Sequence, residues 1–519
     1  MAEASGHAIV IGAGMAGLAS AGLLAKEGYR VTVVEALPST GGRAGAWEQD
    51  GFHFDTGPSW YLMPEVFEHY FRLMGTSTAR ELDLVPLAPA YRVYNEGLAE
   101  PLDVVSGRES AAALFEGIEQ GAGARLETYL DSARDAYELS VTRFLYDTYE
   151  STAGLRDRAL LRRLPRLLPL LTRPLATHIE RRFTDERLRR ILGYPAVFLG
   201  SSPYRAPSLY HLMSHLDLAD GVRYPMGGFR SVIAAVERLA TAAGAKIETD
   251  APVVRILTAD GAARGVRLAD GRELPGDLVI STADLHHTET ALLEGRDRTY
   301  PHSWWRRRRP GPGALLIMLG VRGTLPQLGH HTLLFTGDWR ENFSAIFGDR
   351  PRIPDPASVY VCRPSATDPS TAPEGHENLF VLVPVPADPA LGRGGTDGGG
   401  DRAVEAAADR AIAQLSQWCG IADLAERIVV RRTLAPGDFA ADLNAWKGNA
   451  LGLEHTLLQS AMFRPRNASR KVTGLMYAGA SVLPGIGLPM CLISAELVVK
   501  RLRGDRTPGP LATPLGQGR

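Results

Sequence analysis

The sequence predicts an α/β fold built on a parallel β-sheet, with a second, interleaved α+β domain. Three observations support this prediction. The apolar run at residues 8–11 is typical of a buried strand, and a glycine-rich turn and an Ala/Leu-rich helix ending near Gly28 follow it. A second apolar strand, residues 30–34, comes next and completes a β-α-β order. At 519 residues the chain exceeds one ordinary hydrophobic core, so we expect two domains.

The turn after the first strand has the spacing GxGxxG, formed by Gly12, Gly14 and Gly17. In such a turn the first glycine allows the tight bend, the second lets backbone N–H groups approach a pyrophosphate, and the third lets the helix pack closely on the strand. The diphosphate would lie at the helix N-terminus, where free N–H groups and the helix dipole favour negative charge. The pattern predicts a Rossmann-like dinucleotide site, and an ordinary glycine turn is the alternative.

Glu35 ends the second strand, about twenty residues after the glycines, which is the spacing of a ribose-binding acid. A carboxylate there accepts hydrogen bonds from both ribose hydroxyls and repels a 2′-phosphate. The alternative is a solvated acid at the end of a strand. Together with the glycine turn, Glu35 makes the dinucleotide site the favoured interpretation.

The residues that follow indicate which nucleotide binds. Gly41, Gly42 and Arg43 come soon after the ribose acid, and the run Asp55-Thr56-Gly57-Pro58 follows them. A nicotinamide dehydrogenase has no evident need for a glycine pair and a cation at this position, whereas a larger cofactor does.

With Gly12-Ala13-Gly14-Met15-Ala16-Gly17, Glu35, Gly41-Gly42-Arg43-Ala44 and Asp55-Thr56-Gly57-Pro58-Ser59, the chain resembles the flavin-dependent carotenoid desaturases of the bacterial phytoene desaturase type. These belong to the wider group of amine oxidase-like flavoproteins, and the resemblance spans nearly the whole chain. It implies a Rossmann-like FAD-binding domain of the amine oxidase/phytoene desaturase type, with FAD as cofactor and an interleaved α+β substrate domain. The cofactor-binding residues that it implies here are Gly12, Ala13, Gly14, Ala16, Gly17, Glu35, Gly41, Gly42, Arg43, Gly57 and Pro58, with the backbone around Val254 at the adenine end.

The second part of the predicted site is C-terminal. A strand at residues 475–478 precedes Gly479, and the run Pro484-Gly485-Ile486-Gly487-Leu488-Pro489 leads into a helix that ends near residue 502. Proline suits a first helical turn, because its missing N–H would be unpaired there. This run is similar to the C-terminal motif of the desaturase family, which implies that Gly479, Gly487, Leu488 and Pro489 contact the flavin. A helix N-terminus there would stabilise the negative charge of reduced flavin.

We expect the two domains to alternate along the chain. The FAD-binding domain is predicted to comprise residues 1–100, 222–300 and 465–505, and the substrate and membrane-associating domain residues 101–221 and 301–464. Residues 506–519 are expected to form a flexible C-terminal tail.

The composition excludes several classes of protein. The formal net charge is −1, so no global charge attracts the chain to nucleic acid, and no nucleic-acid-binding motif accompanies the basic run at residues 306–309. A short polar leader precedes residue 8, without the features of a secretory signal, and no uncharged span is long enough to cross a bilayer. We expect a cytoplasmic protein.

No metal site is expected. The three cysteines, Cys362, Cys419 and Cys491, are far apart and show no zinc-binding spacing. His211 and His215 are four residues apart, but no third ligand with sensible spacing accompanies them. The pair His330-His331 is equally uninformative in sequence.

Two segments combine apolar and basic residues. Residues 155–199 alternate leucine clusters with arginines, and Trp304-Trp305 precede four arginines. This composition is typical of segments that lie on an anionic membrane surface, so we expect peripheral association with the inner face of the cell membrane. The alternatives are a packed helix pair with arginine stems covering apolar surface, and a solvated loop.

The resemblance implies successive desaturation of phytoene, or a related linear isoprenoid, to a lycopene-type polyene by hydride transfer to flavin. The cradle supplies an electron acceptor but no obvious acid, base or nucleophile. By resemblance Asp157, after Arg156, is a candidate acid-base group, with a salt-bridge partner as the alternative. Because only one dinucleotide site is visible, oxygen or a membrane quinone is expected to reoxidise the flavin.

Other functions remain open. A carotenoid isomerase, a ketolase, a polyene saturase and an amine oxidase share the same flavoprotein group. A non-catalytic isoprenoid carrier, of the kind related to Rab escort proteins, would keep the fold but bind no flavin. The intact glycine turn, Glu35 and the Gly41-Gly42-Arg43 run disfavour the carrier.

Overall fold

The computed structural model describes residues 6–150 and 167–515. The first of its two large sheets has five strands, all parallel, in the order β19-β13-β1-β2-β9. Its strands are β1 (His7–Ile11), β2 (Arg30–Val34), β9 (Lys246–Glu248), β13 (Leu278–Ser281) and β19 (Leu475–Tyr477). The α/β fold with a parallel sheet that the sequence predicted is confirmed.

Alternating side chains of this sheet pack into different cores on its two faces. Ala8 and Val10 of β1 face a core that includes helices α1 (Met15–Lys26), α2 (Pro64–Met74), α10 (Phe229–Ala242) and α17 (Leu488–Arg503). Ile9 and Ile11 face a core shared with the antiparallel meander β10 (Val253–Ala259), β11 (Ala262–Leu268) and β12 (Glu273–Pro275). Because both faces are covered, the strands are apolar on both sides.

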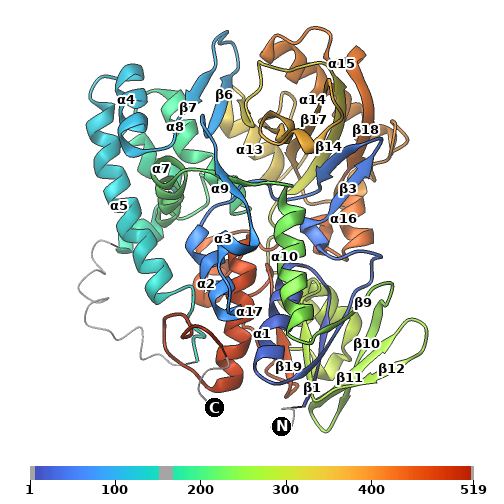
Figure 1. The fold of residues 1–519 in the computed structure, drawn as a ribbon. Helices are drawn as coiled ribbons and strands as arrows, with labels where there is room; N and C mark the ends of the chain where they lie inside the picture. The colour runs from blue at the N-terminus through green and yellow to red at the C-terminus, as the bar shows by residue number, and fades with distance from the viewer. Residues whose placement is uncertain (1–5, 151–166, 516–519) are drawn as a thin grey trace.

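The second large sheet has seven strands and occupies the other end of the molecule (Figure 1). The order is β18-β14-β17-β16-β15-β6-β7, and only β15 and β6 run parallel to each other. The strands are β6 (Tyr91–Asn95), β7 (Leu102–Val104), β14 (Gly313–Arg322), β15 (His331–Phe335), β16 (Val359–Cys362), β17 (His376–Val385) and β18 (Ile428–Leu434).

Helices surround this second sheet. The main ones are α4 (Arg108–Ile118), α5 (Ala122–Arg143), α7 (Leu175–Glu180), α8 (Glu186–Gly193), α13 (Trp339–Phe347), α14 (Arg402–Cys419) and α16 (Pro436–Asp442). Figure 1 shows α4 and α5 along one side of the molecule and α14 at the top. No helix in the described part of the chain is both long and apolar enough to cross a bilayer.

The chain crosses between the two sheets several times. Strand β6, residues 91–95, lies within the range 1–100 that we assigned to the FAD-binding domain, yet it pairs with β15 in the seven-stranded sheet. Strand pairing therefore places the first crossing before Tyr91 rather than at residue 100.

The prediction of a flexible tail is wrong for residues 506–515. Leu511 and Leu515 are 6% and 5% exposed. The N–H of Leu515 donates to the Leu73 carbonyl at 3.1 Å, and the ammonium of Lys500 donates to the Thr507 carbonyl at 2.6 Å. The two leucines bury apolar surface against α2 and α17, which offsets the entropy lost by ordering the segment.

In both apolar-basic segments, described side chains that we expected on a membrane-facing surface are buried. Trp305 is only 4% exposed, and its ring N–H donates to the Tyr300 carbonyl at 3.0 Å, so it belongs to the core rather than to a membrane-facing surface. In the described part of the other segment, residues 167–199, Ile179, Phe183 and Leu188 are buried. This part fits the alternative of packed helices with arginine stems covering apolar surface.

Candidate functional site

The glycine turn between β1 and α1 has the geometry that a diphosphate site requires. Gly12 has a φ of 96°, and a Cβ at Gly17 would lie 1.9 Å from the Gly12 carbonyl oxygen, so the helix packs directly on the end of the strand. A Cβ at Gly14 would approach nothing closer than the Gly41 carbonyl oxygen, at 3.7 Å. The turn is therefore tight at Gly12, closely packed at Gly17 and open at Gly14.

Glu35 follows β2 and lies against this turn. Its side chain is buried; Oε2 accepts from the Ala13 N–H at 2.6 Å and Oε1 from the Leu37 N–H at 3.0 Å. The carboxylate is thus held beside the predicted diphosphate position, where a ribose would lie. Ala13, predicted from the family motif, is part of the same arrangement.

Gly41, Gly42 and Arg43 lie alongside the glycine turn. The Gly41 N–H donates to the Ala13 carbonyl at 2.9 Å, and Gly41 and Gly42 have φ values of 109° and 57°, which favour glycine. A Cβ at Gly57 would lie 1.9 Å from the Arg43 carbonyl oxygen, so the Gly57-Pro58 run packs directly against Arg43. Tertiary structure thus brings three separate sequence runs to one end of α1.

The guanidinium of Arg43 is incompletely paired. Its Nε and Nη2 atoms are buried and have no hydrogen-bond partner, and Nη2 lies 3.8 Å from a carboxylate oxygen of Asp284. Unsatisfied buried donors cost about 1–3 kcal/mol each. An anionic or carbonyl-bearing cofactor would satisfy them, and with the open face at Gly14 they fit FAD.

The C-terminal motif reaches the same place. A Cβ at Gly479, which follows β19, would lie 3.5 Å from the Cβ of Ala16 in the first turn of α1. Gly487 has a φ of 116° and precedes α17, which has Leu488 and Pro489 in its first turn. Helices α1 and α17 pack against each other, and the N-terminus of each offers free N–H groups to a bound anion.

Two predicted residues are not placed in contact with the rest of the site. Val254 lies at an irregularity in β10 with 48% of its side chain exposed; the nearby Ala251 N–H donates to the Glu35 carbonyl at 2.8 Å. A backbone contact of Val254 with adenine stays a prediction. Asp157 lies outside the described residues.

Sequence reasoning missed a buried arginine that holds the C-terminal motif. Arg464 is 2% exposed and donates to the carbonyls of Ala480 at 2.7 Å, Gln459 at 3.2 Å and Val482 at 3.3 Å. The side-chain amide of Asn467 donates to the Leu483 carbonyl at 2.9 Å. These bonds fix the turn before Gly485, and no motif in the sequence marks either residue.

Replacing Arg464 with methionine is expected to lower the free energy of unfolding by about 3 kcal/mol, because buried carbonyls lose charged donors. It is also expected to weaken FAD retention, because the turn before α17 loses its anchor. Urea unfolding and flavin content after gel filtration measure the two effects. Arg466→Met, which changes an exposed neighbour, is the control, and equal behaviour of the two variants would contradict the anchoring role.

Two carboxyls, those of Asp55 and Asp217, have raised pKa values. Burial raises the pKa of Asp55 to about 6, although it accepts the N–H groups of Phe229 at 2.7 Å and Arg230 at 3.1 Å. Asp55 therefore joins the Gly57-Pro58 run to the N-terminus of α10. Burial also raises the pKa of Asp217 to about 7, and its Oδ2 accepts the hydroxyls of Tyr91 and Tyr194, both at 2.9 Å.

An aromatic cluster begins directly after Gly57-Pro58-Ser59. The ring of Trp60 lies 4.5 Å from His331, 5.3 Å from Phe198 and 5.4 Å from Tyr91, measured between centroids. Tyr194 and Tyr360 complete it. Trp60, directly after the Gly57-Pro58-Ser59 run, thus packs among rings from the second sheet and its helices. Tyr91, Tyr194, His331 and Tyr360 are buried, whereas Trp60 and Phe198 are partly exposed.

The whole chain is similar to flavoproteins. Residues 15–503 match the family described as flavin containing amine oxidoreductase. The chain is 38% identical to carotenoid 3,4-desaturase of Haloarcula japonica, covering 97% of this chain and 100% of the relative. It is 37% identical to the zeta-carotene-forming phytoene desaturase of Myxococcus xanthus, covering 95% and 93%.

Solved structures share the fold at low identity. Putrescine oxidase bound to putrescine aligns with a TM-score of 0.59 at 14% identity, covering 96% of this chain and 99% of that one. A Rab GDI from Plasmodium falciparum aligns with a TM-score of 0.53 at 12% identity, covering 98% and 99%. With its intact cradle and its full-length relatives, the chain belongs to the flavin-containing amine oxidoreductase family and is an FAD-dependent oxidoreductase of the phytoene desaturase type.

Proposed function

We propose that the chain is a carotenoid desaturase that introduces successive C=C bonds into phytoene or a related linear isoprenoid. The observation that carries the proposal is an intact flavin cradle in a chain that is 38% and 37% identical to two carotenoid desaturases over nearly its full length. The partly exposed rings of Trp60 and Phe198, close to the cradle residues, support a hydrocarbon substrate, because an apolar chain packs favourably on aromatic rings.

The chain's own residues bind and orient the reactants. When bound, FAD supplies the two-electron acceptor for hydride removal from an allylic carbon. Glu35 would hold the ribose, the N-terminus of α1 would hold the diphosphate, and the N-terminus of α17 would stabilise negative charge.

The test is anaerobic incubation of FAD-loaded protein with phytoene in liposomes, followed by absorption spectroscopy and product analysis. We expect the oxidised flavin bands to bleach while conjugated polyene bands rise. Unchanged flavin bands would contradict the proposed substrate. An isomerase would change geometry without net flavin reduction, a ketolase would add oxygen, and an amine oxidase would reduce flavin only with an amine. Absence of flavin after FAD addition would favour a carrier.

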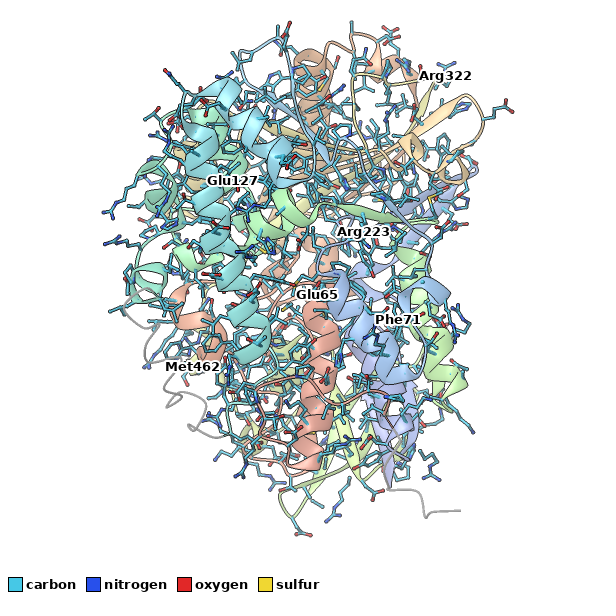
Figure 2. The ribbon with its side chains drawn as sticks, turned by 60° about the vertical axis from the view of Figure 1, so that its left-hand side comes forward. Glu65, Phe71, Glu127, Arg223, Arg322 and Met462 are labelled. Carbon is cyan, nitrogen blue, oxygen red and sulfur yellow. The ribbon has the colours of Figure 1, made fainter. Side chains whose placement is uncertain are left out.

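The proposal includes peripheral binding to the inner face of the cell membrane, through a surface that we call the 457–463 patch. Leu457, Leu458, Met462 and Phe463 are 38%, 64%, 38% and 50% exposed. They lie in two short helices, η11 (Leu457–Gln459) and η12 (Ala461–Phe463), and Figure 2 shows Met462 near the margin of the molecule. Exposed apolar side chains grouped in this way suit insertion into an interface.

Cations accompany the 457–463 patch. Its Gln459 exchanges two hydrogen bonds with the backbone of Arg309, at 2.9 and 3.0 Å, and so ties the patch to the basic run that includes the exposed Arg306 and Arg307. Arg466, which is also exposed, follows the patch in the chain. Apolar side chains flanked by cations favour an anionic lipid surface over a neutral one.

The double variant Leu458→Glu/Phe463→Glu is expected to lower binding to anionic vesicles by about tenfold or more, because two apolar anchors become anions. Co-sedimentation with vesicles of phosphatidylglycerol and phosphatidylcholine measures the bound fraction. Val429→Glu is the matched control, since Val429 is 44% exposed on strand β18. Equal binding of the double variant and the control would overturn this membrane surface.

The electron acceptor is proposed to be oxygen or a membrane quinone, in keeping with the single dinucleotide motif of the sequence. Stopped-flow reoxidation of photoreduced enzyme by oxygen, and anaerobically by a soluble quinone, compares the two. An acceptor that reoxidises the flavin more slowly than the steady-state turnover measured with the substrate is excluded.

A further inference from the structure

Three potential metal ligands that are separated in the sequence meet inside the second sheet. His331 in β15 and Cys362 in β16 are directly opposed across an antiparallel pair of strands, and His330 precedes His331. One ligand atom from each of these residues lies within 4.8 Å of the others. His330, His331 and Cys362 are only 6%, 0% and 2% exposed.

The two imidazoles have the hydrogen-bonding pattern of metal ligands. Nδ1 of His331 bonds to the Tyr360 hydroxyl at 2.8 Å, and Nδ1 of His330 bonds to the Thr367 hydroxyl at 2.7 Å. The Nε2 atoms of both rings are buried and have no partner. Metal-binding histidines are commonly oriented in this way, with one ring nitrogen held by an oxygen and the other free for the metal.

The unpaired nitrogens need an explanation, because a buried polar atom without a partner costs about 1–3 kcal/mol. Water or protein groups usually satisfy such atoms, but here two of them belong to a cluster that also holds a thiol. The hydroxyl of Tyr224, whose ring lies 4.6 Å from that of His330, is also buried. The cluster thus contains potential metal-binding atoms that form no hydrogen bond within the protein.

We propose that His330, His331 and Cys362 bind one zinc ion through Nε2, Nε2 and Sγ. Zinc favours imidazole and thiolate together, in tetrahedral geometry, with ligand atoms about 3.3–3.6 Å apart. The ligand atoms lie within 4.8 Å of one another, so binding requires them to close by up to about 1.5 Å. Binding replaces the thiol proton of Cys362, which leaves to solvent, and forms three metal–ligand bonds without any change of oxidation state. The Tyr224 hydroxyl or a water takes the fourth position.

The zinc would join strands β15 and β16 through His331, which belongs to the aromatic cluster around Trp60. The ring of Trp60 stacks on His331 at 4.5 Å with an interplanar angle of 11°, so fixing His331 also fixes Trp60. The inference goes beyond the proposed function and does not depend on which hydrocarbon the enzyme uses.

The first experiment measures zinc in tag-free, FAD-loaded protein after incubation with zinc and dialysis against metal-free buffer. We expect about one zinc per chain in the wild type, and about tenfold less in Cys362→Ser and in His331→Gln. Cys419→Ser changes a buried cysteine in α14 and is the control; it should keep the wild-type zinc content. Wild type without retained zinc, or Cys362→Ser with full zinc, would overturn the proposal.

Cobalt substitution provides a second readout, which does not require that any variant folds. Tetrahedral cobalt with a thiolate ligand absorbs strongly at longer wavelengths than oxidised flavin, whereas cobalt in a six-coordinate oxygen site absorbs weakly. We expect the strong bands when Co²⁺ is added to metal-free wild-type protein, and their loss when zinc is added. Weak bands alone would contradict a thiolate-containing site.

Discussion

Gly14→Ala is expected to lower the affinity for FAD by at least about tenfold, while the melting temperature of the apoprotein changes by no more than about 2 °C. The backbone of Gly14 has a φ of −73°, which alanine adopts without strain, and the added Cβ would meet only the Gly41 carbonyl oxygen, at 3.7 Å. The protein itself therefore has room for the methyl group. The diphosphate must approach this backbone closely, so the same methyl group would obstruct it.

Alanine substitutions at two other glycines serve as comparisons for Gly14→Ala. Gly17→Ala is expected to destabilise the apoprotein as well as the complex, because its Cβ would lie 1.9 Å from the Gly12 carbonyl oxygen. Gly117→Ala adds a methyl group to α4 with nothing within 4 Å, so it should affect neither property. Fluorescence titration of apoprotein with FAD and thermal unfolding of apoprotein provide the two measurements. Unchanged FAD affinity in Gly14→Ala would contradict the assigned diphosphate position.

Asp217→Asn is expected to remove a loss of stability that the wild type shows as pH rises. Burial raises the pKa of the folded-state carboxyl to about 7 from 3.8, so the folded protein binds more protons than the unfolded chain between these values. Stability contributed by this group therefore falls as pH rises through the window from about 4 to 7. Asparagine stays neutral throughout and avoids this cost.

The measurement is the difference in unfolding free energy between Asp217→Asn and wild type as a function of pH. It should shift in favour of the variant by about 3 kcal/mol between pH 5 and pH 8. The two unfolding free energies are also expected to differ by an amount that does not depend on pH. The reason is that the amide of the variant introduces a donor where Oδ1 of Asp217 has no partner. Asp131→Asn, which removes a carboxylate from the exposed face of α5, is the control. A pH-independent difference would show that Asp217 is already ionised or solvated.

Local sequence patterns were sufficient for the cradle. Glycine spacing, apolar runs and the position of Glu35 predicted β1, α1 and β2 within about one or two residues of their observed bounds. The C-terminal motif was also recognisable, and the helix after it begins at Leu488 as expected. These features depend on backbone conformation and periodicity over a few residues, which the sequence displays directly.

Features that depend on long-range contacts were wrong or invisible in the sequence. Trp305 and the segment around Leu511 were expected at the surface and are buried, because hydrophobicity alone does not say whether a partner surface exists. Arg464 holds the flavin-site turn through carbonyls 16 and 18 residues away, and no spacing rule indicates such bonds.

The β-α-β unit, its glycine turn and the carboxylate that ends β2 could all be identified in the amino-acid sequence. Which distant side chains share a buried environment, such as Asp217 with Tyr91 and Tyr194, became apparent only in the folded chain. Likewise, His331 and Cys362 are 31 residues apart in the chain and become neighbours only through the antiparallel register of β15 and β16. The physical reason is that strand register and core packing are set by contacts between elements, whereas turns and helix ends are set by the residues within them.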